Sequence, residues 1–384
     1  MKSFAIIGAQ PALSREELRV CLDSDVSGSD EVVLFETKRS LEDLQRQLGG
    51  VSKLGTVVTS ITAASLEETL LQELEQVPQN GKLRFGISVY SLGGPTGEIR
   101  KAVRRIGLSV KKHLRDSGRS VRLVESKEPT LSSVVVSKNK LHVHGTEFLL
   151  LVGRDEILLG CTQTVQDFAD WSHRDFDRPG RDAKRGMLPP KLARMMLNLS
   201  GKDLATSVVL DPFCGSGTVL MEATILGAKQ LIGSDVQKKA VEDTRATLAW
   251  LKQEGVPLPD AHLAHTPAAK LAEHLDAQSV DLIVTEPFLG TPREGQEPID
   301  AVKAQTEELE ALYRESFGAL KSLLTEGARV VIANPVHIVG NERFPVPTKE
   351  LMIALGYRHE PFSEPLVYER EGQFVARELL RFSI

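Results

Sequence analysis

The sequence has few cysteines and no long apolar segment. Its three cysteines, Cys21, Cys161 and Cys214, lie far apart and form no C-x-x-C pair, which argues against a disulfide framework and against a zinc module. No stretch approaches the roughly 18 apolar residues that span a bilayer, and the apolar run at the amino terminus is too short for a signal peptide. We therefore expect a cytoplasmic protein without a membrane segment.

The sequence also lacks the overall excess of positive charge that is typical of proteins coating nucleic acid. Its 47 Lys and Arg residues and 52 Asp and Glu residues give a net charge of −5. The charge is unevenly spread, because residues 98–122 hold nine Lys or Arg residues and two acidic ones, a local charge of +7. Such a segment favours a selective contact with phosphates, although a solvated helix face has the same composition.

The first half of the chain predicts two small α+β units. With 384 residues, of which 41% are hydrophobic, the chain is long enough for two or three cores. Residues 1–60 alternate short apolar strands with two amphipathic helices, the first expected to open at Ser14. Residues 61–163 predict a second unit, with the basic helix over 98–117 and a strand hairpin over 141–163.

The second half has a different pattern. Residues 164–190 are polar and contain several glycines and prolines, which predicts a linker. Over residues 191–384, short apolar strands alternate with helical stretches of ten or more residues. The strands are predicted at 206–211, 230–235, 280–286 and 328–335. Apolar strands separated by helices are typical of a doubly wound α/β domain, with a parallel sheet covered on both faces.

The stretch "VVLDPFCGSGTVLMEATILG" (208–227) has the form of a ligand-binding loop at the end of a strand. It has no lysine after its last loop glycine, as a P-loop requires, and Leu220 replaces the third glycine of a dinucleotide fingerprint. Asp211 would repel a pyrophosphate, but it would attract the ammonium and sulfonium of S-adenosylmethionine (SAM). Asp235, at the next strand end, suits ribose hydroxyls.

Several further residues of the loop are candidate SAM contacts. The glycines allow close approach of the backbone to the ligand. The alternative is that each acid only caps a helix. The candidate cofactor-binding residues in this region are Asp211, Pro212, Phe213, Gly215, Gly217, Thr218 and Asp235.

The segment "DLIVTEPFLG" (281–290) resembles the motif of the amino methyltransferases, which has an Asp, Asn or Ser, two prolines and an aromatic residue. The resemblance implies that Glu286 and the carbonyl of Pro287 accept hydrogen bonds from an exocyclic amine, and that Phe288 stacks on the base. Glu286 is longer than the usual acid, Phe288 stands at the second proline, and Leu289 stands at the aromatic residue. These departures indicate either a rebuilt acceptor pocket or a lost activity.

Residues 174–201 resemble the segment before the SAM loop in the archaeal and eukaryotic tRNA guanosine N2-methyltransferases that act at position 10. That resemblance implies a ferredoxin-like unit (1–60), a THUMP RNA-binding domain (61–163), a linker (164–190) and a Rossmann-like SAM-dependent methyltransferase domain (191–384). It also implies that a turn and helix close over the methionine end of SAM. The residues of that turn are Met187, Leu188, Pro189, Pro190 and Lys191.

The same resemblance gives the basic segment a role, because THUMP domains of this family bind the acceptor end of tRNA. The candidate phosphate contacts are Lys101, Arg104, Arg105, Lys111, Lys112 and Arg119. Linker arginines form a second group of candidates, although neighbouring aspartates could simply pair with them. These are Arg174, Arg178, Arg181 and Arg185.

The predicted function is therefore direct methyl transfer from SAM to the exocyclic N2 of a guanosine in tRNA, without a covalent enzyme intermediate. Alternatives are an rRNA guanine-N2 or other nucleic-acid amino methyltransferase, and a noncatalytic RNA-binding relic. The family also implies a possible small activating protein partner. We expect no metal, since His142 and His144 lack a nearby third ligand, and we expect Trp171 to anchor the linker against a domain.

Overall fold

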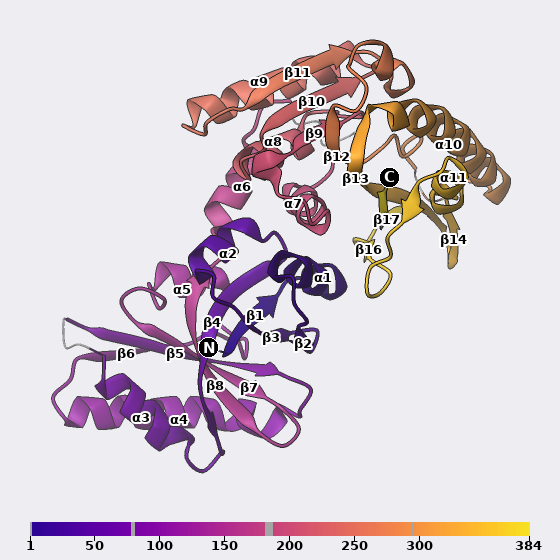
Figure 1. The fold of residues 1–384 in the computed structure, drawn as a ribbon. Coiled ribbons are helices and arrows are strands. Elements are labelled where there is room, and N and C mark those ends of the chain that lie inside the picture. Colours follow the sequence, from indigo (N-terminus) through magenta and orange to yellow (C-terminus); the bar gives the residue numbers. More distant parts are fainter. Residues whose placement is uncertain (1, 78–80, 181–186, 294, 296) are drawn as a thin grey trace. The chain divides into compact units, whose positions relative to one another are not determined.

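The computed structural model describes residues 2–77, 81–180, 187–293, 295 and 297–384. The chain divides into two compact units, residues 1–168 and 169–384, where the sequence predicted four segments (Figure 1). The boundaries predicted at 60/61, 163/164 and 190/191 fall inside a strand, a second strand and a helix respectively. The first two predicted units, residues 1–60 and 61–163, share one sheet.

Unit 1 contains a mixed sheet with the strand order β2-β3-β1-β4-β8-β7-β5-β6. Its strands are β1 (Lys2–Ile7), β2 (Ser27–Gly28), β3 (Val32–Glu36), β4 (Val51–Ile61), β5 (Leu83–Ser91), β6 (Val121–Val124), β7 (Thr146–Val152) and β8 (Ile157–Val165). Its helices are α1 (Pro11–Leu22), α2 (Leu41–Gln47), α3 (Leu66–Glu75), α4 (Gly97–Asp116) and α5 (Ser133–Lys138). β4 pairs with β1 on one side and with β8 on the other, and so joins the two halves of the sheet.

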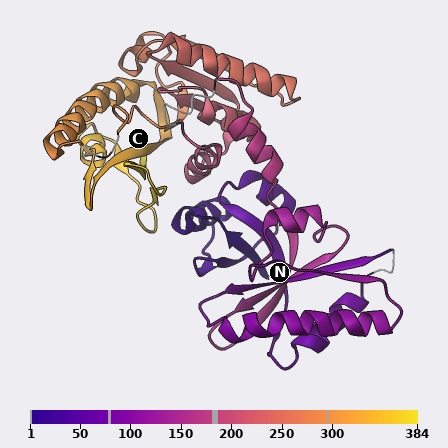
Figure 2. The ribbon, with the colours of Figure 1, turned by 180° about the vertical axis from the view of Figure 1, so that it is seen from behind.

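The helices of unit 1 bury apolar stripes against this sheet. α3 and α4 lie side by side on one face (Figures 1 and 2), where Leu70, Val110 and Leu114 pack on Phe85 and Leu150. The predicted basic helix is thus confirmed as α4, with its apolar side turned to the sheet and its charged side to solvent.

Two local predictions in unit 1 are wrong. α1 begins at Pro11, and Ser14 lies inside the helix, where its hydroxyl donates to the carbonyl of Gln10 at 2.8 Å. A proline suits the first turn because its missing N–H has no partner there in any case. Residues 141–145 form turns, so His142 and His144 do not share a strand face; the strand begins at Thr146.

Unit 2 contains a second sheet with the order β11-β10-β9-β12-β13-β17-β15. Its strands are β9 (Val208–Asp211), β10 (Gln230–Asp235), β11 (Asp260–His265), β12 (Val280–Thr285), β13 (Leu324–Val339), β14 (Glu342–Pro345), β15 (Arg358–His359), β16 (Val367–Tyr368) and β17 (Val375–Ser383). Its helices are α6 (Phe168–Phe176), α7 (Pro190–Leu199), α8 (Thr218–Ile225), α9 (Lys238–Gln253), α10 (Ile299–Leu320) and α11 (Thr348–Ala354), with short 3₁₀ turns η1 (Leu204–Thr206), η2 (Ala268–Glu273) and η3 (Lys321–Leu323).

Strands β9 to β13 run parallel, as the sequence predicted, whereas β17 is antiparallel to β13. α10 and α11 cover one face, where Tyr313 and Phe317 pack on Ile283. α7, α8 and α9 lie on the opposite face. In β10, Gly233 faces Leu220 of α8, whereas the adjacent residue Ile232 points the other way, into the core that contains Tyr313 and Phe317. The predicted α/β fold with helices on both faces is confirmed.

The predicted linker contains a helix. α6 is amphipathic, and Trp171 on its inner side is 8% exposed, as expected for an anchor. Within the described residues, no helix is both long enough and apolar enough to cross a bilayer.

A buried ion pair lies where the two halves of the first sheet meet. Lys53 of β4 donates to the Glu147 carboxylate of β7 at 2.6 Å, and both side chains are almost fully buried. The same carboxylate accepts hydrogen bonds from the hydroxyls of Ser88 and Thr162, each at 2.6 Å. Burial lowers the pKa of Lys53, and the adjacent Glu147 opposes that shift. A buried charge without its partner is costly, so the pair fixes how β4, β5, β7 and β8 align.

We expect Lys53→Met to destabilise unit 1 by about 3–5 kcal/mol, because Glu147 then stays buried without a counter-charge. The measurement is urea-dependent hydrogen exchange of β4, β7 and β8 in the full chain. Lys38→Met, at an exposed lysine, is the control and should change little. A cost below about 1 kcal/mol for Lys53→Met would contradict a structural role for the pair.

Candidate functional site

Three carboxylates follow the ends of three neighbouring parallel strands. Asp211 ends β9, Asp235 ends β10, and Glu286 directly follows β12. β9 lies between the other two strands, with Leu210 paired to Ile232 and to Ile283. The chain moves outward from β9 to β10 and β11, and then returns to the other side of β9 with β12. This reversal of direction is where open α/β sheets bind their ligands.

The loop after β9 depends on two glycines. Gly215 has φ +53° and Gly217 has φ +82°, conformations that other residues rarely adopt. A Cβ at Gly217 would lie 3.0 Å from the side chain of Thr244. Gly217 also caps α8, so the loop ends in a helix N-terminus with free backbone N–H groups.

Hydrogen bonds to the end of β10 and from α9 hold the loop in place. Asp235 accepts hydrogen bonds from the N–H of Gly215 at 3.1 Å and from the N–H of Gln237 at 2.8 Å. Thr244 of α9 donates to the carbonyl of Gly215 at 2.9 Å. Cys214 is buried beneath the loop, and burial raises the pKa of its thiol, which agrees with a packing role and not with a nucleophile.

Asp211 is the most buried of the three acids, at 2% exposed. Its Oδ1 accepts hydrogen bonds from the Thr285 hydroxyl at 2.7 Å and from the N–H of Phe213 at 3.2 Å. Burial, aided by the charges of Asp235 and Glu286, raises the pKa of Asp211 to about 7 against the opposing effect of these hydrogen bonds. A buried group of carboxylates is stabilised by a cationic ligand, so the residues present fit the predicted cofactor.

Glu286 is held by an arginine that the sequence motifs did not reveal. Nε of Arg377, on β17, donates to Oε1 of Glu286 at 2.8 Å, and both side chains are largely buried. Burial raises the pKa of Glu286, and the Arg377 charge opposes this shift. The two residues are 91 positions apart in the chain, and only the pairing of β13 with β17 brings them together.

The rest of the predicted acceptor segment divides into a buried and an exposed part. Pro287 is buried, and the carbonyl of Phe288 accepts a hydrogen bond from the hydroxyl of Tyr313 at 2.7 Å. The Phe288 side chain is 53% exposed, an unusual position for a large apolar group. The backbone is thus fixed by α10 while the ring is available for stacking.

Two polar residues in the second half of β13, Asn334 and His337, are buried. Asn334 donates to the carbonyl of Val346 at 3.0 Å and accepts from the Thr348 hydroxyl at 2.6 Å, so it closes the turn before α11. His337 is fully buried, and burial followed by the charge of Arg293 lowers its pKa to about 4.

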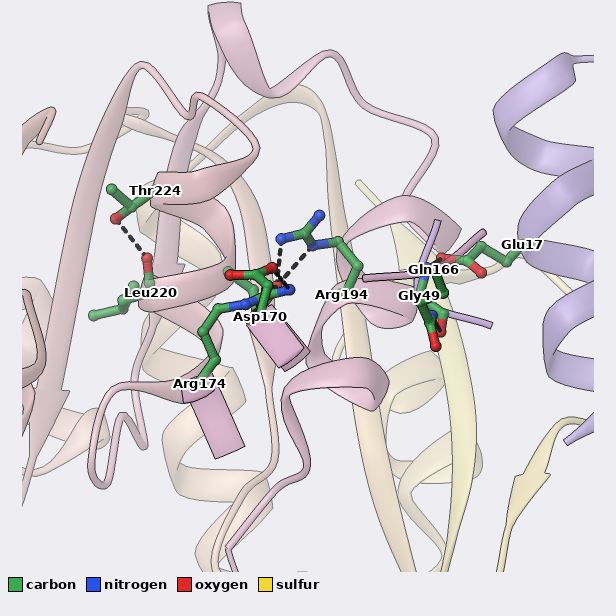
Figure 3. Close-up of polar contacts among 9 residues, drawn as sticks. Glu17, Gly49, Gln166, Asp170, Arg174, Arg194, Leu220 and Thr224 are labelled. Atoms are coloured by element: carbon green, nitrogen blue, oxygen red, sulfur yellow. Dashed lines mark hydrogen bonds and ion pairs between the residues drawn. The ribbon is translucent and has the colours of Figure 1, made fainter. Parts of the chain in front are cut away.

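The two linker arginines in the described part of the chain, Arg174 and Arg178, are buried. Arg174 of α6 donates to both oxygens of Glu222 on α8 at 2.6 and 2.7 Å, and to Asp170 at 2.8 Å (Figure 3). Arg194 of α7 donates to the same Glu222 at 2.7 Å. The guanidinium of Arg174 also lies over the Trp171 ring, 3.8 Å from its centroid.

The predicted RNA contacts at Arg174 and Arg178 are therefore wrong. Their exposed fractions are 4% and 3%, too small for a phosphate contact. Arg174 instead ties α6 to α8, the helix that the glycine loop opens. Arg181 and Arg185 lie outside the described residues. Pro189 is the N-cap of α7, and α7 packs against α8.

The basic helix α4 presents most of its predicted contacts to solvent. Lys101, Arg104, Arg105 and Lys112 are exposed and lie within one third of the helix circumference, whereas Lys111 is half-buried. The phosphate contact predicted for Arg119 is wrong, because its guanidinium donates to the backbone carbonyls of Leu74 and Val77 at the end of α3. It therefore caps a helix and leaves the exposed stripe as the phosphate candidate.

The described residues contain no group of three or more His, Cys, Asp or Glu side chains placed to hold a metal ion.

Comparisons with known proteins agree with this geometry. The family model of UPF0020, an RMKL-like methyltransferase domain, matches residues 178–342. A tRNA (guanine(10)-N2)-dimethyltransferase of Methanothermobacter thermautotrophicus is 28% identical over 339 residues, which are 85% of this chain and 87% of that protein. The protein of the same name from Pyrococcus abyssi is 33% identical over 135 residues, 35% of this chain and 37% of that protein.

Among solved structures, TrmN from Thermus thermophilus matches with a TM-score of 0.58 and 18% identity, covering 100% of this chain and 99% of that one. At this identity the likeness supports the fold alone, and it extends across both units. The methyltransferase resemblance predicted from the sequence is confirmed over residues 178–342, where the family model matches, and the archaeal relative is similar over most of the chain.

Proposed function

We propose that this protein transfers a methyl group from SAM to the exocyclic N2 of a guanosine in tRNA, at position 10. The observation that carries the proposal is the placement of Glu286 and Phe288 beside the glycine loop, at the end of the strand that neighbours β9. The names of the archaeal relatives supply the substrate, since both are guanine(10)-N2 enzymes.

Asp211, Asp235 and the backbone of the loop would hold the cofactor. Asp211 offers a buried carboxylate to the cationic part of SAM, and Asp235 retains free lone pairs for ribose hydroxyls although both its oxygens accept backbone N–H groups. SAM would supply an electrophilic methyl group: a bond from N2 to the methyl carbon would form as the carbon–sulfur bond breaks, its electron pair would go to sulfur, and N2 would release one proton to solvent.

The acceptor side of the site must orient a weak nucleophile. The lone pair of an exocyclic amine is delocalised into the ring, so hydrogen bonds to its N–H groups and correct alignment supply most of the help. Glu286 accepts one such bond with the oxygen that Arg377 does not hold, the Pro287 carbonyl accepts the other, and the exposed Phe288 ring stacks on the flipped base.

Residues 61–163 of unit 1 would dock the tRNA as a THUMP domain, with residues 1–60 as their ferredoxin-like neighbour. The exposed stripe of Lys101, Arg104, Arg105 and Lys112 contacts the phosphate backbone, which measures shape and distance instead of sequence. We propose that the reaction takes place in the cytoplasm, where tRNA is found. A small activating protein remains part of the proposal, as the family resemblance implies.

The test of the function is to incubate the protein with methyl-labelled SAM and unmodified tRNA, then digest to nucleosides. We expect labelled N2-methylguanosine, and a loss of at least about 100-fold in rate for Glu286→Ala. Glu364→Ala, at an exposed acid outside the site, is the matched control. Label in another nucleoside, or SAM binding without any label in tRNA, would contradict the proposal and favour another substrate or a noncatalytic relic.

The affinity for SAM should depend on pH through Asp211. Its folded pKa of about 7 lies above the ordinary value, so ionising it costs the free protein stability as the pH rises from about 4 to about 7. A cationic ligand favours the ionised form. The dissociation constant, measured by calorimetry, should therefore fall by up to about tenfold per unit between pH 5.5 and 7. Asp211→Asn should remove the dependence, and an unchanged profile in that variant would assign it to another group.

Reversing the charge of the α4 stripe should weaken tRNA binding. Lys101→Glu, Arg105→Glu and Lys112→Glu together remove up to three phosphate contacts, so the slope of log K against log salt should fall by about 2 or more. A filter-binding titration over a range of salt concentrations measures it. The control carries the same charge change on α9 (Lys238→Glu, Lys239→Glu and Lys252→Glu). Equal losses in both variants would contradict docking by α4.

A further inference from the structure

Glu286 departs from the amino methyltransferase pattern by one extra methylene, and its surroundings show how the longer side chain is held. We infer that Arg377 is a positioning residue for methyl transfer: it grips one oxygen of Glu286 and leaves the other turned to the amine of the substrate. The inference rests on the function proposed above and names a residue, at the other end of the domain sequence, on which that function depends.

The geometry of the pair is specific. Nε of Arg377 lies 2.8 Å from Oε1 of Glu286, and the side chains are 7% and 13% exposed. Among the described residues, Arg377 is the only hydrogen-bond donor to the Glu286 carboxylate. The other oxygen of Glu286, Oε2, is thus available to accept a hydrogen bond from an N–H of the base.

Arg377 is itself fixed from behind. Its Nη1 donates to the carbonyl of Val375 at 3.0 Å and to the side chain of Gln373 at 3.3 Å. Arg377 pairs with Pro335 in the middle of the β13–β17 ladder, so its backbone is held by the sheet. The guanidinium therefore cannot follow Glu286 if the carboxylate swings, and it restrains the added rotatable bond of the longer acid.

The counter-charge also decides what Glu286 can do to an amine. An ionised carboxylate only accepts hydrogen bonds, whereas a protonated one also donates and would compete for the amine lone pair. Other groups that bear on Glu286 do not supply positive charge: Asp211 of β9 is another acid, and Tyr313 of α10 is a neutral phenol whose pKa is raised by burial and by Glu286. Burial raises the pKa of Glu286 and Arg377 opposes it, so removing Arg377 should leave the acid protonated to a higher pH.

The inference explains why the departure need not abolish activity. A shorter Asn at this position would be neutral and would require no counter-charge. The pair Glu286 and Arg377 then acts as one unit, and its two members should be strongly non-additive.

The experiment is a double-mutant cycle in the full chain: Arg377→Met and Glu286→Asn, singly and together. Arg377→Met alone should lower kcat by about 100-fold, with SAM affinity and KM for tRNA changed less than about threefold. The acid limb of its pH–rate profile should move to higher pH. In the Glu286→Asn background, the same substitution should change kcat by less than about threefold.

Arg377→Lys keeps the charge without the rigid fork and should keep the pH profile of the wild type while losing part of kcat. The double variant removes both charges, so it should fold even where Arg377→Met leaves an unpaired buried carboxylate and does not. Equal losses of kcat from Arg377→Met in both backgrounds, with an unmoved pH profile, would overturn the inference and leave Arg377 a purely structural residue.

A second readout needs neither SAM nor tRNA. In protein with ¹³C-labelled glutamate carboxyls, the Glu286 signal, assigned by its loss in Glu286→Gln, should titrate at higher pH in Arg377→Met than in the wild type, whereas Arg377→Lys, which keeps the charge, should titrate like the wild type. An unshifted titration in Arg377→Met contradicts the pairing. Absence of methyl transfer by the wild type, with the shift present, instead contradicts the proposed function, so the two failures are distinguishable.

Discussion

The site depends on three carboxylates that are partly or fully removed from water at the carboxyl ends of neighbouring parallel strands. β9, β10 and β12 end side by side, so Asp211, Asp235 and Glu286 must gather there. Their charges are compensated differently: Asp211 by a hydrogen bond from Thr285 that does not prevent its pKa from being raised, Asp235 by backbone N–H groups, and Glu286 by Arg377. Asp211 has the weakest compensation, which makes it the group that a cationic cofactor would stabilise most.

Features encoded in short stretches could be predicted from the sequence. The glycines at 215 and 217, the acids at strand ends and the basic helix all depend on local periodicity and backbone conformation, and the structure has them where expected. Contacts between distant segments could not be predicted. Arg377 reaches Glu286 only through strand pairing, and Glu222, the buried acid partner of Arg174, lies 48 residues away on α8, whereas its pairing with neighbouring Asp170 agrees with the alternative that the sequence offered.

The wrong predictions have identifiable physical causes. Arginines in a polar segment suggested a surface, but α6 is amphipathic, and Trp171 and Glu222 draw Arg174 into the interior. Ser14 suggested a helix start, but Pro11 opens the helix a turn earlier. The boundary expected near residue 60 lies in β4, where Lys53 and Glu147 join the two halves of one sheet. At Arg174 and in β4 a tertiary contact outweighed a local preference, whereas at Ser14 a stronger local signal, Pro11, set the helix start.

The central claim is that the acidic strand ends select a positively charged methyl donor. The most direct measurement compares, by calorimetry, the binding of SAM with that of 5′-methylthioadenosine, which keeps the nucleoside but has neither the sulfonium charge nor the amino acid. The account predicts that SAM binds at least about 100-fold more tightly, and that Asp211→Asn removes most of the difference. Equal affinity of the wild type for the two molecules would contradict the account.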